Sequence, residues 1–171
     1  YDYCFGAGRS GGVNVLSWLS MQEQFGLTVV NKVMDQDHTY SSSSIRSILE
    51  MGDVRKAAQR LGHWWHVEGQ VCKGDQRGRT IDFPTANLRL DGYIEPKYGV
   101  YAVRVIIEDG EHKGVWQAIA NVGRRPTFDK QDVLLESHIF DFSHEIYEQS
   151  IKVEFVDFIR DEMKFDGLEA L

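Results

Sequence analysis

The chain has 171 residues, of which 42% are hydrophobic and 26% charged, and its formal net charge at pH 7 is −7. This composition excludes a disordered protein, and the acidic balance argues against a nucleic acid as the main partner, because phosphate backbones bind clusters of lysine and arginine. The sequence contains no apolar run of the roughly 20 residues that span a bilayer. We therefore expect a cytoplasmic protein with no membrane partner.

The first 62 residues mix strand-like and helical patterns of apolar residues. We expect strands at residues 1–5 and 27–33, and helices at residues 13–25, 44–51 and 53–61. Asp53 and Gly62 suit the N-cap and the C-terminal cap of the last of these helices. This part of the chain is therefore predicted to be α/β.

Two motifs in this part each permit two interpretations. Residues 6–11 form a G-x-G-x-x-G between a strand and a helix, which fits either a dinucleotide-binding turn or a plain tight turn. The acidic residue expected about 20 positions later is missing, which favours the plain turn over a dinucleotide-dependent oxidoreductase. Serines 41–44 could cap the next helix or hold a triphosphate at its N-terminus.

After Gly62 the apolar period becomes strand-like, so we place a domain boundary between residues 1–62 and residues 63–171. Strands are expected at residues 65–72, 99–107, 114–122, 133–142 and 151–158, and a closing helix follows within residues 157–171. Asp109-Gly110 is a hairpin signal. The pattern predicts a mainly β fold, a small antiparallel Greek-key barrel with a C-terminal helix.

The segment from residue 73 to 89 concentrates features that suit a phosphate. It holds four basic and two acidic residues in an otherwise acidic chain, which points to a small anionic ligand. Glycines permit close approach of the backbone, arginines bind phosphate, and a proline turn presents two neutral oxygen ligands. The candidate binding residues here are Gly74, Arg77, Gly78, Arg79, Pro84, Thr85 and Asn87.

A candidate general base lies in the strand predicted at residues 133–142. Alternation places Glu136 and His138 on the same face as Leu134, Phe140 and Phe142. A carboxylate on a largely apolar face suits proton transfer. The alternative is a glutamate that pairs with Arg124 or Arg125. The turn that carries Arg125 could close on a nucleotide, or it could be a turn and no more.

Taken together, these segments resemble riboflavin kinase, the C-terminal part of the bacterial bifunctional riboflavin kinase and FMN adenylyltransferase. The resemblance covers nearly the whole chain. Its carriers are Gly78-Arg79, Phe83-Pro84-Thr85-Ala86-Asn87, Tyr98-Gly99-Val100-Tyr101, Asn121-Val122-Gly123, Arg125-Pro126-Thr127-Phe128, Leu135-Glu136-Ser137-His138 and Arg160-Asp161-Glu162. Residues 1–62 resemble the tail of the adenylyltransferase domain.

The resemblance implies a six-stranded barrel that transfers the γ-phosphoryl group of ATP to riboflavin and yields FMN and ADP. It implies that Thr85 and Asn87 hold Mg²⁺ and the ATP phosphates, and that the loop at residues 74–79 covers the nucleotide. Glu136 would accept the proton of the hydroxyl, and Arg160 with the following loop would border the flavin. Pro84 and Arg125 belong to the matching motifs that surround the nucleotide.

The sequence departs from the family pattern in two ways. Asp82 stands where the family usually has glycine, and it supports a second hypothesis, a non-catalytic flavin- or nucleotide-binding module. The chain also begins at Tyr1 and ends at Leu171 within a predicted helix, so we expect a piece of a longer polypeptide. Because the front of the adenylyltransferase domain is missing from these residues, we expect them to make no FAD, although the longer protein would do so.

Overall fold

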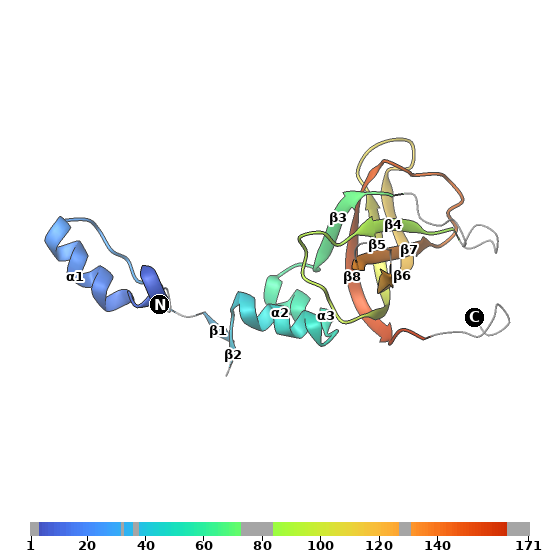
Figure 1. Cartoon of the computed structure of the whole chain (residues 1–171). Coiled ribbons are helices and arrows are strands. Elements are labelled where there is room, and N and C mark those ends of the chain that lie inside the picture. Colours follow the sequence, from blue (N-terminus) through green and yellow to red (C-terminus); the bar gives the residue numbers. More distant parts are fainter. Residues whose placement is uncertain (1–3, 32, 36–37, 73–83, 127–130, 164–171) are drawn as a thin grey trace. The chain divides into compact units, whose positions relative to one another are not determined.

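The computed structural model describes residues 4–31, 33–35, 38–72, 84–126 and 131–163 (Figure 1). The chain divides into two compact units, Tyr1–Ser41 and Ser42–Leu171. No helix within the described ranges is long and apolar enough to cross a membrane. The candidate site lies in the second unit, so the first is described briefly.

In its described residues the first unit contains one α-helix and few other regular elements. Its elements are the 3₁₀ turn η1 (Ala7–Arg9), the helix α1 (Val13–Glu23) and the two short strands β1 (Met34–Asp35) and β2 (His38–Thr39). Residues 6–11 form a tight turn, closed by two backbone hydrogen bonds of 2.9 and 3.0 Å between Phe5 and Gly11. The prediction of a strand at residues 27–33 was wrong. Residues 27–31 and 33, which the structure describes, belong to no strand, and Val29 and Val30 are exposed.

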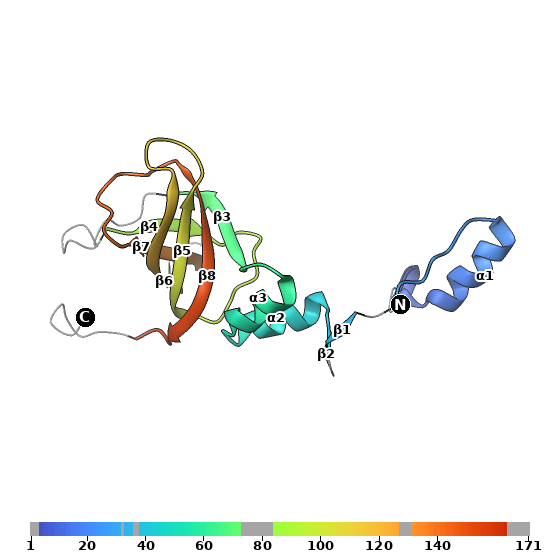
Figure 2. The same cartoon turned by 180° about the vertical axis from the view of Figure 1, so that it is seen from behind.

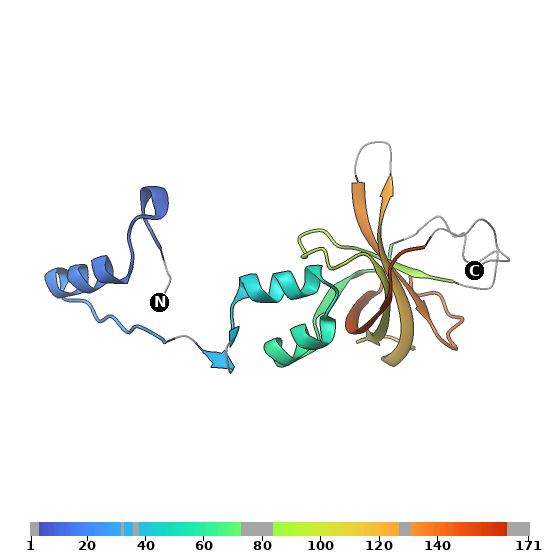
Figure 3. The same ribbon diagram turned by 90° about the horizontal axis from the view of Figure 1, so that it is seen from below.

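Two helices begin the second unit, α2 (Ser42–Glu50) and α3 (Val54–Leu61). The predicted caps of α3 are confirmed. The Asp53 carboxylate accepts a hydrogen bond from the Lys56 amide at 3.0 Å, and Gly62 adopts a φ of 78°. Helix α3 packs against the strand β8 (Figure 3), where Arg55 pairs with Asp157 at 2.7 Å. The helices share one compact unit with the barrel, and the domain boundary after Gly62 stays a prediction.

Six antiparallel strands curl into a barrel (Figures 1 and 2). They are β3 (His66–Gln70), β4 (Ala86–Arg89), β5 (Gly99–Ile107), β6 (Gly114–Pro126), β7 (Gln131–Ile139) and β8 (Ser150–Arg160). Their order in the sheet is β3-β8-β5-β6-β7-β4, and a hydrogen bond of 2.8 Å from the Cys72 amide to the Asn87 carbonyl joins the two edges. Since β8 returns beside β5 after the β5-β6-β7 meander, the barrel is a Greek key, as predicted.

Side chains that alternate along the strands fill the barrel. In β5 the inward positions are Tyr101, Val103, Val105 and Ile107, all buried. The Tyr101 ring packs edge-on against Phe155 and Phe158, and its hydroxyl donates a hydrogen bond to the Lys97 carbonyl. Burial raises the pKa of Tyr101, because the phenolate would be poorly solvated there.

Two expectations for the strand ends were wrong. Strand β7 ends at Ile139 rather than at residue 142, because Asp141 turns the chain with a φ of 54°. Phe142 then packs in the core, with its ring 4.9 Å from that of Trp116, instead of sharing a face with Glu136. Strand β8 continues to Arg160, and most of the expected closing helix lies outside the described residues.

Gly99 at the start of β5 offers a test of this packing. Its φ is 147°, and a Cβ at this position would overlap the carbonyl oxygen of Arg160. We expect Gly99→Ala to lower the free energy of unfolding in urea by about 2 to 4 kcal/mol, because strain and overpacking add. Gly69→Ala is the matched control, since its Cβ would meet nothing closer than Leu88 at 3.6 Å. Equal effects of the two substitutions would contradict this account.

Candidate active site

Three polar side chains form a row across the outer face of the barrel. In the register, Glu136 of β7 lies opposite Asn87 of β4 on one side and opposite Asn121 of β6 on the other. Residues directly opposite each other in antiparallel strands project to the same face. The neighbours of Glu136 in β7, Leu135 and Ser137, are fully buried on the core face, so the row faces away from the core.

The row continues from β6 across β5 to β8. Asn121 lies opposite Val100 of β5, and Val100 lies opposite Arg160 of β8. The register thus brings three residues predicted from the sequence, Asn87, Glu136 and Arg160, into one row across five strands. Arg160 is exposed and donates a hydrogen bond of 3.1 Å to the Asp161 carbonyl.

Asn87 presents a buried acceptor with no protein partner in the described part of the chain. Its side chain is 5% exposed, and its Nδ2 donates to the Thr85 carbonyl at 3.3 Å. No described residue donates a hydrogen bond to its Oδ1. Because an unsatisfied buried polar atom costs about 1 to 3 kcal/mol, such an atom suits a ligand that supplies the missing interaction.

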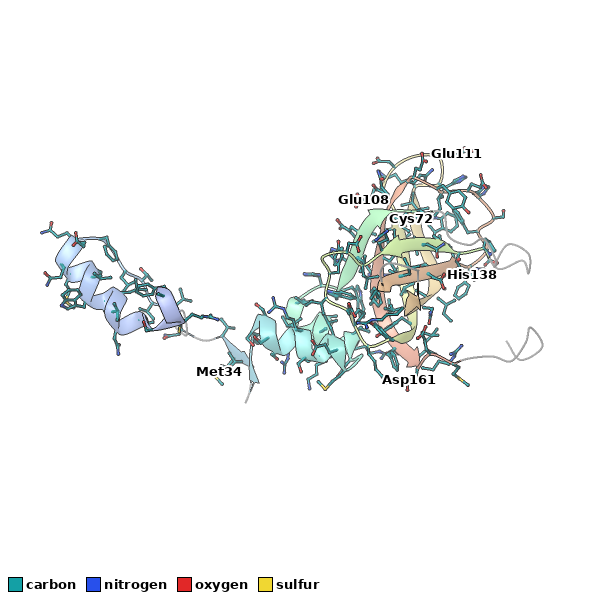
Figure 4. The ribbon with its side chains drawn as sticks, in the orientation of Figure 1. Met34, Cys72, Glu108, Glu111, His138 and Asp161 are labelled. Atoms are coloured by element: carbon teal, nitrogen blue, oxygen red, sulfur yellow. The ribbon has the colours of Figure 1, made fainter. Side chains whose placement is uncertain are left out.

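The turn before β4 is attached to β7 by a histidine. His138, two residues after Glu136, donates from Nδ1 to the Pro84 carbonyl at 2.9 Å (Figure 4). This hydrogen bond fixes the turn that carries Thr85 beside the strand that carries Glu136. Sequence alternation placed His138 on the Glu136 face, but it did not indicate this contact.

A small pocket of about 130 Å³ opens beside Glu136. It is lined by Asn121, Gly123, Arg124, Leu134, Glu136 and Glu162. Glu162 follows β8, and its Oε1 accepts a hydrogen bond of 3.1 Å from Asn121 Nδ2. The pocket is therefore lined by two carboxylates and one guanidinium, and Asn121 binds the carboxylate of Glu162.

The segment that carries Glu162 is anchored by its neighbour. Asp161, the first residue after β8 (Figure 4), pairs with Lys97 at 2.7 Å. The Lys97 ammonium also lies 4.5 Å from the centre of the Phe158 ring, and the Lys97 amide donates to the Leu49 carbonyl of α2 at 3.0 Å. The position of Glu162 thus depends on contacts with both the barrel and the helical pair.

Arg124 takes part in a second polar cluster next to the pocket. It donates to the Tyr98 hydroxyl at 2.5 Å and to Glu95 at 3.1 Å, and the hydroxyl in turn donates to Glu95. These hydrogen bonds, first that of Tyr98 and then that of Arg124, hold the pKa of Glu95 below its ordinary value. Burial and the adjacent Glu95 raise the pKa of Tyr98.

Five of the binding residues predicted from the sequence have no described side chain. Gly74, Arg77, Gly78 and Arg79 lie outside the described residues, as does Asp82. Arg125 lies in β6, but its side chain is outside the described part. Sequence reasoning assigned no role to Gly123 and did not indicate the contact between Asn121 and Glu162, which are 41 residues apart.

Comparison with known proteins identifies one family. The family model of riboflavin kinase, called flavokinase, matches residues 61–171. The bifunctional riboflavin kinase/FMN adenylyltransferase of Haemophilus influenzae is 41% identical over 172 residues, and that of Bacillus subtilis is 39% identical over 175 residues. The alignments cover 99% and 100% of this chain and 54% of each relative. The chain thus spans about half the length of the curated relatives it matches.

Solved structures are similar to the chain as well. One of them is described as the crystal structure of a macrolide-efflux protein from Streptococcus pneumoniae, and its TM-score is 0.79 at 36% sequence identity. The match covers 98% of this chain and 53% of that chain.

The cluster beside the pocket yields a test by titration. We expect Tyr98→Phe to raise the pKa of Glu95 toward its ordinary value, because the largest stabilising hydrogen bond to the carboxylate is lost. In the native protein the lowered pKa means that this interaction stabilises the fold above the ordinary glutamate range and is lost as the pH falls through the folded-state pKa. Side-chain NMR titration of Glu95 measures the change. An unchanged or lowered midpoint in Tyr98→Phe would contradict the assignment.

Proposed function

This chain belongs to the riboflavin kinase family, and we propose that it transfers the γ-phosphoryl group of ATP to the 5′-hydroxyl of riboflavin, giving FMN and ADP. The observation that carries the proposal is the row in which Glu136 lies between Asn87 and Asn121 beside an open pocket. This arrangement combines a carboxylate base with a buried oxygen acceptor on the adjacent strand. Phosphoryl transfer requires mainly such positioning and charge stabilisation.

In the proposed reaction Glu136 acts as the general base. Its carboxylate accepts the proton of the 5′-hydroxyl as the hydroxyl oxygen forms a bond to the γ-phosphorus of ATP. The bond between that phosphorus and the β,γ-bridging oxygen breaks, and ADP leaves with the electron pair. Asn121 and Asn87 flank the base from the two neighbouring strands and hold the reacting groups along one line.

We propose that Thr85 and Asn87 hold Mg²⁺ together with the ATP phosphates. The residues fit this ion, because Mg²⁺ prefers neutral and anionic oxygen ligands and Asn87 Oδ1 is a buried oxygen without a partner among the described residues. When bound, Mg²⁺ would neutralise negative charge on the phosphates. The hydrogen bond from His138 to Pro84 supports this function by fixing the turn that carries Thr85.

The other contacts to substrates are proposed from the matching motifs. Gly74, Arg77, Gly78 and Arg79 would cover the nucleotide with Pro84, and Arg125 would close on it from β6. Arg160 would border the flavin, which its place in the row supports. We propose that the protein acts in the cytoplasm on free riboflavin and ATP, with no nucleic acid or membrane as partner.

The relatives are named for a second activity as well, FMN adenylylation. Residues 1–60 lie outside the kinase family model and inside the alignments with the bifunctional relatives. This supports an FMN adenylyltransferase function for a longer protein that contains this chain, and FAD formation from FMN and ATP by that protein is the test. The macrolide efflux for which the similar structure is named is not carried over, because the family model and the curated relatives agree on the kinase.

The kinase is tested by incubating the chain with riboflavin, ATP and Mg²⁺ and separating the products. We expect FMN and ADP in equal amounts. Quenching of flavin fluorescence without ADP would support the non-catalytic module instead.

Replacement of the proposed base separates catalysis from binding. We expect Glu136→Gln to lower kcat by about 10²- to 10⁴-fold, because the amide cannot accept the proton, while riboflavin affinity stays within a few-fold. Steady-state FMN formation and flavin fluorescence titration give the two quantities. Full turnover in the variant would remove Glu136 from this role.

The metal assignment is tested by two substitutions that retain shape, Thr85→Val and Asn87→Leu. Each removes one proposed oxygen ligand, so we expect the Mg²⁺ concentration for half-maximal activity to rise about tenfold or more. Asp91→Asn is the control, because this exposed residue pairs with Arg89 outside the row. An unchanged Mg²⁺ requirement in both variants would exclude these two residues as ligands.

A further inference from the structure

The pocket beside Glu136 contains a second carboxylate to which the reaction as described assigns no part. Glu162 lines the same pocket and approaches it from the segment that follows β8. A second base is not needed for the transfer of one phosphoryl group. We therefore expect Glu162 to bind the substrate rather than to transfer a proton.

Two contacts with β6 fix the position of the Glu162 carboxylate. Its Oε1 accepts a hydrogen bond from Asn121 Nδ2, and it lies so close to the backbone of β6 that a Cβ on Gly123 would overlap it. A side chain at position 123 would therefore displace the carboxylate. The structure also anchors the preceding residue, because Asp161 pairs with Lys97 at 2.7 Å.

The charges of the pocket select the kind of ligand that can enter. The lining combines two carboxylates with the Arg124 guanidinium, which donates hydrogen bonds to Tyr98 and Glu95. The carboxylates accept hydrogen bonds from a neutral group that carries several hydroxyls. The pocket thus presents two carboxylate acceptors to a chain of hydroxyl donors.

We propose that Glu162 accepts hydrogen bonds from the ribityl hydroxyls of riboflavin other than the 5′-hydroxyl, and so determines specificity for a polyhydroxylated side chain. The inference rests on the proposed kinase function. Glu136 receives the terminal hydroxyl, and Glu162, held by Asn121 in the same pocket, binds the hydroxyls that precede it. The enzyme thereby distinguishes a ribityl chain from a plain alkyl alcohol of the same length.

The test compares riboflavin with an analogue that keeps the isoalloxazine ring and a terminal hydroxyl but has a 5-hydroxypentyl chain. We expect the wild-type chain to prefer riboflavin in kcat/KM. In Glu162→Ala, kcat/KM for riboflavin should fall by about 10- to 100-fold, because a hydrogen bond to a charged group is lost, while the value for the analogue changes little. The preference for riboflavin should shrink by the same factor.

Gly123→Ala is a second variant that leaves the glutamate in the chain and moves its carboxylate. We expect it to reduce the preference for riboflavin in the same direction. Glu111→Ala is the control, because this exposed glutamate lies at the opposite end of the barrel from Asp161 (Figure 4). It should alter neither value.

The outcomes separate the two proposals. If the wild-type chain makes FMN and Glu162→Ala keeps the wild-type preference, the role of Glu162 is overturned and the kinase function stands. If Glu162→Ala lowers kcat/KM equally for both substrates, Glu162 does not recognise the hydroxyls and the inference is also overturned. If the wild-type chain makes no FMN, the kinase function itself fails.

Discussion

The candidate site depends on the register of β7 between β4 and β6. This register places Glu136 opposite both Asn87 and Asn121, and it directs Leu135 and Ser137 into the core. A slip by one residue would exchange the two faces, burying the carboxylate and exposing the core leucine. Because Leu135 packs in a closed barrel with no free edge at this strand, the hydrophobic core fixes the position of the base.

The second requirement is the placement of the chain segments at the two ends of the row. His138 fixes the turn before β4, and Lys97 fixes the segment after β8. Lys97 also donates its amide to Leu49 of α2, so the helical pair and the barrel jointly hold the segment that carries Glu162. The residues that we propose to contact ATP and flavin thus come from opposite ends of one row, with the base between them.

The spacing of apolar residues predicted the longer helices and strands well and the short strands poorly. Strand β5 was predicted with its observed bounds, since nine alternating residues leave little ambiguity, and the caps of α3 followed from Asp53 and Gly62. Strand β4 has four residues after a proline turn, too few for alternation to show, and the resemblance implied a sixth strand without placing it. In the site, alternation placed Glu136 correctly on the outer face, but the contact between Asn121 and Glu162 joins distant segments and needs the folded chain.

The central claim is that ATP with its metal and riboflavin meet along the row of Asn87, Glu136 and Asn121. The most direct measurement replaces Mg²⁺ by Mn²⁺ in the presence of ATP and records the side-chain amide signals of the two asparagines by NMR. The account predicts that both signals broaden strongly, while the indole signal of Trp116, which donates to His112 away from the row, persists. Broadening of the Trp116 signal with both asparagine signals unchanged would contradict the claim.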